Sequence, residues 1–308
     1  MSVVSRIRQW GFRRFVQVAL QRIAGVDKHE EAIASLNYFL NQYVDITKLP
    51  PAKDPDLRIL QLADVEFLAL FEKFCDKHQL RFWLDYGTLL GAVRHHGVIP
   101  WDDDTDVSMM REDFERLYTL REELSSVGIS LTVKEGGWYG LGYRHEQTGL
   151  WIDVYPKDLY QTQPLSEDTA ESINRCFEQY HKKYLKHNPI ADFDALRKQR
   201  KTVFSRLPQG THNVVIQSPD HIEVLNQFFD HETLFPLRRG VFEGREFWIP
   251  NDANRYLRAV YGEDYMSFPQ SGLLHHDEGR GALSTWAKKY GVDMNTVMAE
   301  LQNKMNLL

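Results

Sequence analysis

The chain has 308 residues, a formal net charge of −6 and 43% hydrophobic residues. A chain of this length buries enough apolar surface for one large core, or for a core with appended helices. Its acidic balance, without a basic stripe interleaved with aromatic residues, argues against a nucleic-acid partner. Its two cysteines, Cys75 and Cys176, form neither a disulfide framework nor a zinc motif, so we expect a reducing compartment.

Residues 3–23 form a basic segment that contrasts with the acidic remainder. The segment carries five arginines and no acidic residue. On a helical wheel most of its apolar residues gather on one side, and Arg6, Arg13 and Arg14 gather on the other. The arginines are too frequent for a membrane-spanning helix or a secretory signal. We therefore expect residues 1–26 to form an amphipathic helix on an anionic membrane surface, with docking on protein as the alternative.

Residues 57–78 follow as the first strongly periodic helix. Its apolar face consists of Leu60, Ala63, Phe67, Phe71 and Phe74. Residues 82–84 indicate a short buried strand, and the glycine-rich residues 87–93 indicate a turn that enters a helix. The free N–H groups at Gly87 and Thr88 would then point at an anion such as phosphate. A glycine that merely permits a tight turn is the alternative.

Residues 100–106 place four carboxylates within five positions. The apolar run over 107–110 predicts a strand, so Asp104 and Asp106 should leave the same face of it. Two carboxylates in this arrangement are typical of a Mg²⁺ (or Mn²⁺) site whose other ligands are water and substrate phosphate oxygens. A solvated acidic loop is the alternative. The neighbouring anion site favours the metal.

A third carboxylate is available at Asp153. We expect a strand over 150–155, in which Ile152 and Val154 face one side while Asp153 and Trp151 face the other. An acid on a strand beside large apolar residues suggests a third metal ligand. The alternative is a half-exposed position paired with a lysine or arginine.

The remaining pattern is mixed. It predicts a helix over 112–125, strands over 129–134 and 139–144, and a helical region over 166–206. Residues 135–143 indicate a hairpin, because the strand-to-helix setting of a dinucleotide fingerprint is lacking. No linker or internal repeat divides the chain. We expect an α/β (α+β) fold, with a small mixed sheet flanked by helices and with helical additions at both ends.

Two histidine pairs and one arginine are further site candidates. Adjacent residues point about 100° apart on a helix, so His95–His96 and His275–His276 are poor chelating pairs for zinc. Contact with a phosphate, or a base role at His275 or His276, is the better interpretation. Arg94 either pairs with the acidic residues or holds a phosphate in a bidentate contact.

Two motifs together resemble a known family. Residues 87–94 (GTLLGAVR) followed by 97–106 (GVIPWDDDTD) are similar to the signature of the LicD/fukutin family, which includes bacterial LicD phosphocholine transferases and the fukutin-related ribitol-phosphate transferases of animals. Residues 261–266 resemble its distal "YG-DYM" element. The resemblance runs over about 57–276 and says little about 160–245.

The resemblance implies a nucleotidyltransferase-like catalytic domain over 57–276. Residues 1–26 and 277–308 would then be the membrane-interface helix and a C-terminal helical extension. That fold carries its chemistry on a Gly-Ser/Thr turn, an acidic pair spaced by one residue and a third acid on a later strand. The matching residues are Gly87, Thr88, Asp104, Asp106 and Asp153.

The implied activity is metal-dependent transfer of a phospho-alcohol from a CDP-alcohol to a hydroxyl of a cell-surface glycan, with release of CMP. Phosphocholine is the first expectation, with ribitol-phosphate and glycerol-phosphate as alternatives. The acceptor would be lipid-linked or a surface polysaccharide, as in lipopolysaccharide biosynthesis. The protein would then be cytoplasmic and peripheral on the inner face of the membrane.

Six more residues enter this site hypothesis. Asp102 or Asp103 would take the proton of the acceptor hydroxyl or support the metal ligands, and the sequence leaves both roles open. Choline calls for an aromatic cage, and the same ring faces stack on sugars. The cage candidates are Trp138, Tyr139, Trp151 and Tyr155.

Two other functions are compatible with the fold. The chain could be a nucleotidyltransferase that releases pyrophosphate, or a non-catalytic scaffold of glycan assembly. Carboxylates at all three expected positions, Asp104, Asp106 and Asp153, argue against the scaffold.

Overall fold

The structure is a computed structural model that describes residues 26–134, 138–143, 148–180, 193–217, 227–268 and 291–308. The chain divides into a small unit, residues 1–48 and 265–273, and a large unit, residues 49–264 and 274–308. The predicted membrane-interface helix at 1–26 lies almost wholly outside the described residues. The sequence-based division into 1–26, 57–276 and 277–308 stays a prediction.

The described part of the small unit contains a helix and a short turn. Helix α3 spans Val26–Tyr43, and a 3₁₀ turn spans Ile46–Lys48. The backbone N–H of Phe268 donates a hydrogen bond of 2.8 Å to the side-chain oxygen of Asn41 on α3. This contact links the two chain segments that make up the unit.

The large unit is built on a mixed sheet, which confirms the predicted fold class. Its described strands follow the order β1-β2-β5-β4-β3, and β6 joins β5 to β7. Only β2 and β5 run parallel, whereas every other described pair is antiparallel. The strands are β1 (Phe82–Leu84), β2 (Thr105–Met110), β3 (Ile129–Val133), β4 (Tyr139–Tyr143), β5 (Trp151–Thr162), β6 (His212–Gln217) and β7 (Phe228–Asp230).

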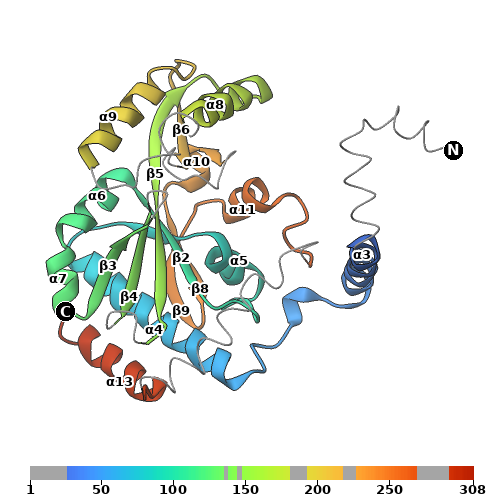
Figure 1. Ribbon diagram of the computed structural model, residues 1–308, viewed down its shortest axis with the longest axis vertical. Coiled ribbons are helices and arrows are strands. Elements are labelled where there is room, and N and C mark those ends of the chain that lie inside the picture. The colour runs from blue at the N-terminus through green and yellow to red at the C-terminus, as the bar shows by residue number, and fades with distance from the viewer. Residues whose placement is uncertain (1–25, 135–137, 144–147, 181–192, 218–226, 269–290) are drawn as a thin grey trace. The chain divides into compact units, whose positions relative to one another are not determined.

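Helices cover both faces of this sheet (Figure 1). Phe71 of α4 packs on Phe82 of β1, and Phe114 of α6 stacks on Tyr139 of β4. The opposite face carries α5 and α11. The helices of the large unit are α4 (Pro55–Lys77), α5 (Tyr86–Arg94), α6 (Arg111–Thr119), α7 (Arg121–Ser126), α8 (Glu167–Tyr180), α9 (Phe193–Phe204), α10 (His231–Leu234), α11 (Ala253–Tyr261) and α13 (Met294–Met305).

Helix α4 confirms the periodic helix predicted over 57–78. Its N-cap is Asp54, whose side chain accepts hydrogen bonds from the first turn, and Pro55 occupies the first helical position. All five residues of the predicted apolar face are buried. Helix α13, in the predicted C-terminal extension, packs along α4 (Figure 1).

Two predicted boundaries were wrong. The helix expected over 112–125 is two helices that break at Leu120, where the hydroxyl of Thr119 bonds back to the carbonyl of Arg116 at 2.7 Å. Strand β5 runs on to Thr162 rather than ending at 155. Pro156 and the charged pair that follows it concealed this continuation, because such residues usually mark a turn.

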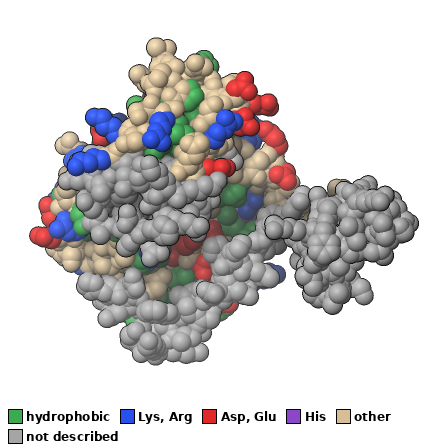
Figure 2. All heavy atoms as spheres, turned by 45° about the horizontal axis from the view of Figure 1, so that its top comes forward, with side chains coloured by type: hydrophobic (Ala, Val, Ile, Leu, Met, Phe, Trp, Pro, Cys, Tyr) green, Lys and Arg blue, Asp and Glu red, His purple; other side chains and the backbone are tan. Residues whose placement is uncertain are grey.

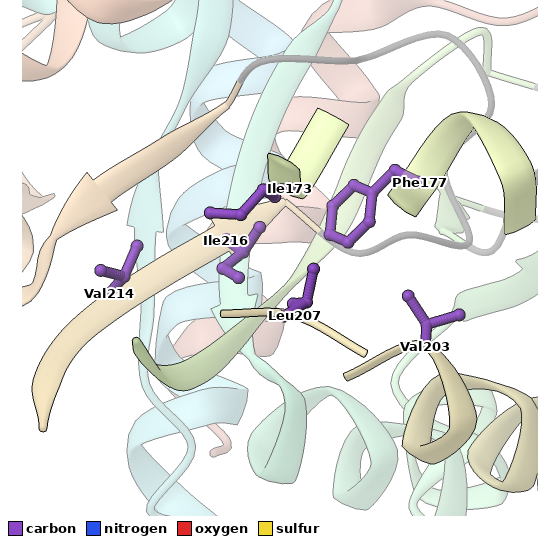
Figure 3. Packing of buried hydrophobic residues seen from close by; sticks show 6 residues of the cluster. All are labelled: Ile173, Phe177, Val203, Leu207, Val214 and Ile216. Carbon is purple, nitrogen blue, oxygen red and sulfur yellow. The ribbon is translucent and has the colours of Figure 1, made fainter. Parts of the chain in front are cut away.

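The extended half of β5 supports a second core. It pairs with β6 along six residues, and α8 and α9 pack over these strands. Figure 3 shows the apolar side chains that meet there. They are Ile173, Phe177, Val203, Leu207, Val214 and Ile216. This core anchors β5 beyond Asp153, the acidic residue near its start.

A short hairpin completes the large unit. Strands β8 (Arg238–Phe242) and β9 (Arg245–Ile249) pair with each other as a separate two-stranded sheet.

Among the described residues, no helix has both the length and the apolar character that crossing a membrane requires.

Candidate functional site

The register of β2 and β5 brings two acidic residues side by side. The strands run parallel, and Asp106 is paired with Asp153. Paired residues of neighbouring strands project from the same face of the sheet. Asp104 lies directly before the first residue of β2, two positions from Asp106. All three predicted acids therefore lie at the N-terminal ends of these two strands.

The next strand leaves room over this row of acids. Gly140 on β4 pairs with Asp153, and a Cβ atom there would lie 1.9 Å from Cζ2 of Trp151. The indole of Trp151 donates a hydrogen bond of 2.6 Å to Oδ1 of Asp153. The ammonium of Lys134 lies 3.9 Å from the centroid of the Trp151 ring. Because residue 140 is a glycine, the indole of Trp151 has room to lie there and to hydrogen-bond to Asp153. The face of the same indole contacts the ammonium of Lys134.

The acidic loop, residues 99–104, carries a second group of carboxylates. Among the described residues, one carboxylate oxygen from each of Asp102, Asp103 and Asp104 lies within 4.8 Å of the other two. This group shares only Asp104 with the predicted metal ligands. Sequence spacing does not reveal the closeness of three consecutive acids, because a loop has no fixed side-chain period. The ligand set Asp104, Asp106 and Asp153 stays a prediction.

Burial and like charges raise the pKa values of the two paired acids. Burial raises the pKa of Asp106 well above its usual value, and the charges of Asp104 and Asp153 add to the rise. Burial likewise raises the pKa of Asp153 to about 6; the Trp151 hydrogen bond opposes this shift, and the charge of Asp104 adds to it. A bound cation would reverse both shifts, because an opposite charge favours the ionised form.

Helix α5 begins against this acidic group. Oδ1 of Asp85 accepts a hydrogen bond of 2.8 Å from the N–H of Tyr86, and its carbonyl accepts one of 2.9 Å from the N–H of Leu89. The N–H groups of Gly87 and Thr88 have no hydrogen-bond partner among the described residues. The two predicted anion donors are therefore the first-turn donors left for a ligand.

Two contacts tie the start of α5 to the acids. Oγ1 of Thr88 accepts a hydrogen bond of 2.8 Å from the N–H of Asp106, so this side chain is committed to the backbone of β2. A Cβ atom at Gly87 would lie 2.8 Å from Oδ2 of Asp102. The missing Cβ at Gly87 thus leaves room for the Asp102 carboxylate beside the helix start, and a larger residue would displace that carboxylate.

A buried ion pair lies further along the same face of the sheet. Nζ of Lys157 lies 3.0 Å from Oδ2 of Asp85, and both side chains are fully buried. Ser108 donates a hydrogen bond of 2.5 Å to the same oxygen, and Lys157 donates one of 2.5 Å to Oε1 of Gln217. Burial lowers the pKa of Lys157, and Asp85 opposes that shift. The pair joins β5, β2 and the start of α5.

Sequence reasoning missed this ion pair. The available signal was the alternation Asp153, Tyr155, Lys157 on a strand whose other residues are mostly apolar. Because the strand was predicted to end at residue 155, Lys157 was not expected to lie on it.

Arg94 ends α5 beside the acidic loop. It is 4% exposed, and its Nε donates a hydrogen bond of 3.0 Å to Nε2 of His95. Its guanidinium carbon lies 5.9 Å from the ring centroid of Trp101. Burial lowers the pKa of Arg94 to about 10, and the charges of Tyr261 and Asp102 oppose the shift. Arg94 is therefore a cation at neutral pH with Asp102 among its electrostatic neighbours.

Three of the four predicted cage aromatics lie on the acidic side of the sheet. Trp138 stacks on Tyr155 with 5.9 Å between ring centroids, and Trp151 contacts Asp153 as described. Tyr139 is fully buried on the other face and stacks on Phe114 at 3.8 Å. Consecutive strand residues point to opposite faces, so Tyr139 is removed from the predicted cage.

Other candidates fall outside this group. The predicted residues His275 and His276 lie outside the described residues. A cavity of about 1330 Å³ lies near Leu80, Met110 and Trp248, and none of the predicted site residues lines it. Figure 2 shows acidic side chains beside hydrophobic ones in the middle of the displayed face.

The sequence over residues 79–252 matches the family described as LicD/FKTN/FKRP, nucleotidyltransferase domain. The chain belongs to the LicD/FKTN/FKRP family. The matched range begins just before β1 and contains every strand of the sheet, the acidic loop and Asp153. The resemblance drawn from residues 87–106 is therefore confirmed.

Individual relatives agree with this assignment. The chain is 26% identical over 255 residues to the lipopolysaccharide cholinephosphotransferase LicD of Haemophilus influenzae. The alignment covers 69% of the chain and 92% of that relative. It is 30% identical over 151 residues to the ribitol 5-phosphate transferase FKRP of Mus musculus and of Homo sapiens, covering 46% of the chain and 30% of each relative. These relatives are transferases of phosphorylated alcohols.

Replacing Asp153 with Asn should stabilise the metal-free protein at pH 7. A carboxyl with a raised pKa binds a proton in the folded chain that the unfolded chain releases, so wild-type stability falls as pH rises from about 4 through about 6. The Asp153→Asn variant avoids this loss, worth roughly 2–3 kcal/mol at about 1.4 kcal/mol per pKa unit. Urea unfolding of both proteins in EDTA at pH 4 and pH 7 measures the difference in unfolding free energy.

The gain should be absent at pH 4, because Asp153 is then largely protonated in the folded wild type and carries no buried charge. Asp168→Asn, at an exposed position on α8, is the matched control and should give no gain at either pH. If Asp153→Asn were no more stable than wild type at pH 7, ionised Asp153 would carry no cost of burial or of repulsion from Asp104 in the folded chain, which would contradict this account.

Replacing Lys157 with Met should destabilise the fold by about 3–5 kcal/mol, since it leaves the carboxylate of Asp85 buried without its counter-charge. The double variant Lys157→Met with Asp85→Asn should recover much of this loss, because no uncompensated charge remains. Urea unfolding of the wild type, both single variants and the double variant measures the coupling. Additive losses would contradict the ion pair.

Proposed function

We propose that this protein transfers a phospho-alcohol from a CDP-alcohol to a hydroxyl of a cell-surface glycan and releases CMP. The observation that carries the proposal is the pairing of Asp106 with Asp153, with Asp104 beside them, inside the region that matches the family. Phosphocholine is the alcohol that we put first, because the relative aligned over most of its length is a cholinephosphotransferase.

The acidic residues fit a hard divalent cation. Carboxylate oxygens are the ligands that Mg²⁺ and Mn²⁺ favour. Burial, with a smaller contribution from neighbouring carboxylates, raises the pKa of both Asp106 and Asp153, and a bound cation would favour their ionised forms. Asp104, Asp106 and Asp153 would hold the ion, with Asp102 and Asp103 close enough to Asp104 to assist. The ion would neutralise charge on the donor diphosphate and on the departing CMP.

The start of α5 would orient the donor. The free N–H groups of Gly87 and Thr88 would donate hydrogen bonds to a phosphate oxygen, and the positive end of the helix adds to the attraction. Arg94 remains charged at neutral pH and would contribute a second positive group near Asp102. These groups would hold the phosphorus while the acceptor hydroxyl approaches in line with the leaving CMP.

Proton transfer would fall to the acidic loop. The acceptor hydroxyl must lose its proton as its oxygen bonds to phosphorus. Asp102 and Asp103 are the candidates for this proton, since neither belongs to the proposed ligand set. Asp103 is half-buried and Asp102 is buried against Gly87, so Asp103 is the more accessible to an entering acceptor.

The aromatic residues suit a quaternary ammonium group. Trp138, Trp151 and Tyr155 lie on the acidic side of the sheet, and Trp151 already holds the ammonium of Lys134 on its ring face. A choline headgroup would find a similar environment at the exposed parts of these rings. Ribitol and glycerol carry no positive charge and would only stack on these rings, so a cation–π contact at them would favour choline.

Incubation with a CDP-alcohol, Mg²⁺ and surface polysaccharide should yield CMP without pyrophosphate, and the polysaccharide should gain the mass of the phospho-alcohol. CDP-choline, CDP-ribitol and CDP-glycerol compared in parallel identify the alcohol by chromatography and mass spectrometry. Asp106→Asn should abolish the transfer. Pyrophosphate released from CTP or UTP, with no CMP from any CDP-alcohol, would instead identify a nucleotidyltransferase.

We also propose that residues 3–23 hold the enzyme on the inner face of the membrane, near a lipid-linked acceptor. Five arginines support binding to anionic lipid, at about 1 kcal/mol each near the surface. Deleting residues 1–24, or replacing Arg6, Arg13 and Arg14 with Glu, should release the protein from anionic vesicles in a flotation assay. Neutral vesicles are the control, and unchanged partitioning of both variants would point to docking on protein.

A further inference from the structure

The acidic loop has no regular secondary structure to hold it. Residues 95–104 connect α5 to β2 without a helix or a strand, and the acidic loop is the part of this connection from residue 99 onward. Within the loop the N–H of Asp102 bonds to the carbonyl of Ile99 at 2.9 Å, which forms a single turn. This turn spans only residues 99–102 and does not by itself fix where the carboxylates lie relative to β5. The backbone needs an external support, because like charges push the loop apart.

The side chain of Gln61 on α4 provides that support. Its amide nitrogen donates hydrogen bonds to the carbonyl of Ile99 at 3.2 Å and to the carbonyl of Asp102 at 2.9 Å. Both N–H donors of one amide group are therefore used on the loop. The residue is 1% exposed, so bulk water does not compete for either bond.

Arg58 and Glu243 keep this amide in place. Arg58 lies three residues before Gln61 on α4, and its guanidinium approaches Oε1 of Gln61 at 3.4 Å. The same guanidinium holds Glu243 through two hydrogen bonds of 2.9 and 2.7 Å. Arg58 thus turns the oxygen of the Gln61 amide away from the loop and its two N–H donors toward the loop carbonyls.

Glu243 also contacts the chain just before the loop. Its Oε1 accepts a hydrogen bond of 3.0 Å from the N–H of Val98, and its own N–H donates one of 3.0 Å to the carbonyl of His96. The hairpin of β8 and β9 therefore holds residues 96 and 98, while Gln61 holds residues 99 and 102. Together they hold the backbone that leads to Asp103.

The same helix also holds the other side of the acidic group. Asp64 lies three residues after Gln61 on α4. It accepts a hydrogen bond of 3.2 Å from the N–H of Trp151. Residues three apart share a helix face, so Arg58, Gln61 and Asp64 form one polar stripe. Helix α4 is therefore bonded both to the acidic loop and to the first residue of β5, two positions before Asp153.

We propose that Gln61 is a positioning residue that sets the separation between the acidic loop and the Asp153 strand, and with it the affinity of the site for a divalent cation. This inference rests on the metal site of the proposed function. Gln61 does not touch the reacting groups. It acts through the backbone of the loop, as residues behind metal ligands commonly do.

The test is calorimetric titration of the purified full-length chain with MnCl₂ alone. Gln61→Met keeps the size of the side chain and removes both donors, and it should weaken Mn²⁺ binding by about 10- to 100-fold, as loss of support behind metal ligands typically does. Leu70→Ala is the matched control, since it leaves a cavity on the opposite side of the same helix. It should lower the melting temperature and leave Mn²⁺ affinity at the wild-type value.

Gln61→Met with an affinity within about threefold of wild type would overturn the inference, since loss of support behind metal ligands costs more. Equal weakening in Leu70→Ala would do so too, because general destabilisation would then explain both. Absence of Mn²⁺ binding in the wild type would overturn the metal site itself. Glu243→Ala at the partly exposed hairpin tip is the second variant. We expect it to weaken binding severalfold, and a folded Glu243→Ala chain with wild-type affinity would overturn the inference even if Gln61→Met did not fold.

Discussion

The parallel pairing of β2 with β5 is the constraint on which the site depends. It is the one parallel pair among the described strands, and its register sets Asp106 against Asp153. A shift of one residue would turn one carboxylate to the opposite face and separate the two charges. The fold therefore holds the buried carboxylate of Asp106 beside the partly buried carboxylate of Asp153 against their mutual repulsion, and such paired, perturbed acids are typical of functional sites.

Contacts in the surrounding elements hold β5 in place against the repulsion between the two carboxylates. The second core beneath α8 and α9 anchors the far half of β5, and the buried pair of Lys157 and Asp85 fastens β5 to the start of α5. Asp85 in turn caps α5, so the same side chain that neutralises a buried lysine also fixes where Gly87 and Thr88 present their N–H groups. The buried lysine and the placement of the N–H groups of Gly87 and Thr88 thus depend on the same side chain, Asp85.

The sequence predicted the parts of the site that follow from regular periodicity. The alternation of strand residues placed Asp153 opposite the apolar side of β5, and the amphipathic face of α4 was predicted residue by residue. The short spacing between the glycine turn and the acids predicted that they act together, and the family resemblance implied which residues match. The alternation also shows why Tyr139 could not join Trp138 on one face, although the aromatic count alone had suggested a cage of four.

What the sequence did not predict depends on contacts between distant segments. Lys157 lies beyond a proline, on a strand that was predicted to end before it, and its partner Asp85 is about seventy residues earlier. Gln61 and Asp64 are polar residues on a helix that was interpreted by its apolar face. The closeness of Asp102, Asp103 and Asp104 depends on a loop whose shape is set by α4 and a hairpin that begins after residue 237.

The most direct measurement is the anomalous diffraction of crystals grown with MnCl₂ and CDP-choline. We expect one manganese ion bound by the carboxylates of Asp104, Asp106 and Asp153, with a donor phosphate at the N–H groups of Gly87 and Thr88. Manganese bound by Asp102 and Asp103 without Asp106 or Asp153 would contradict the assignment of the ligands. A nucleotide bound with no manganese at any of these acids would contradict the metal-dependent site altogether.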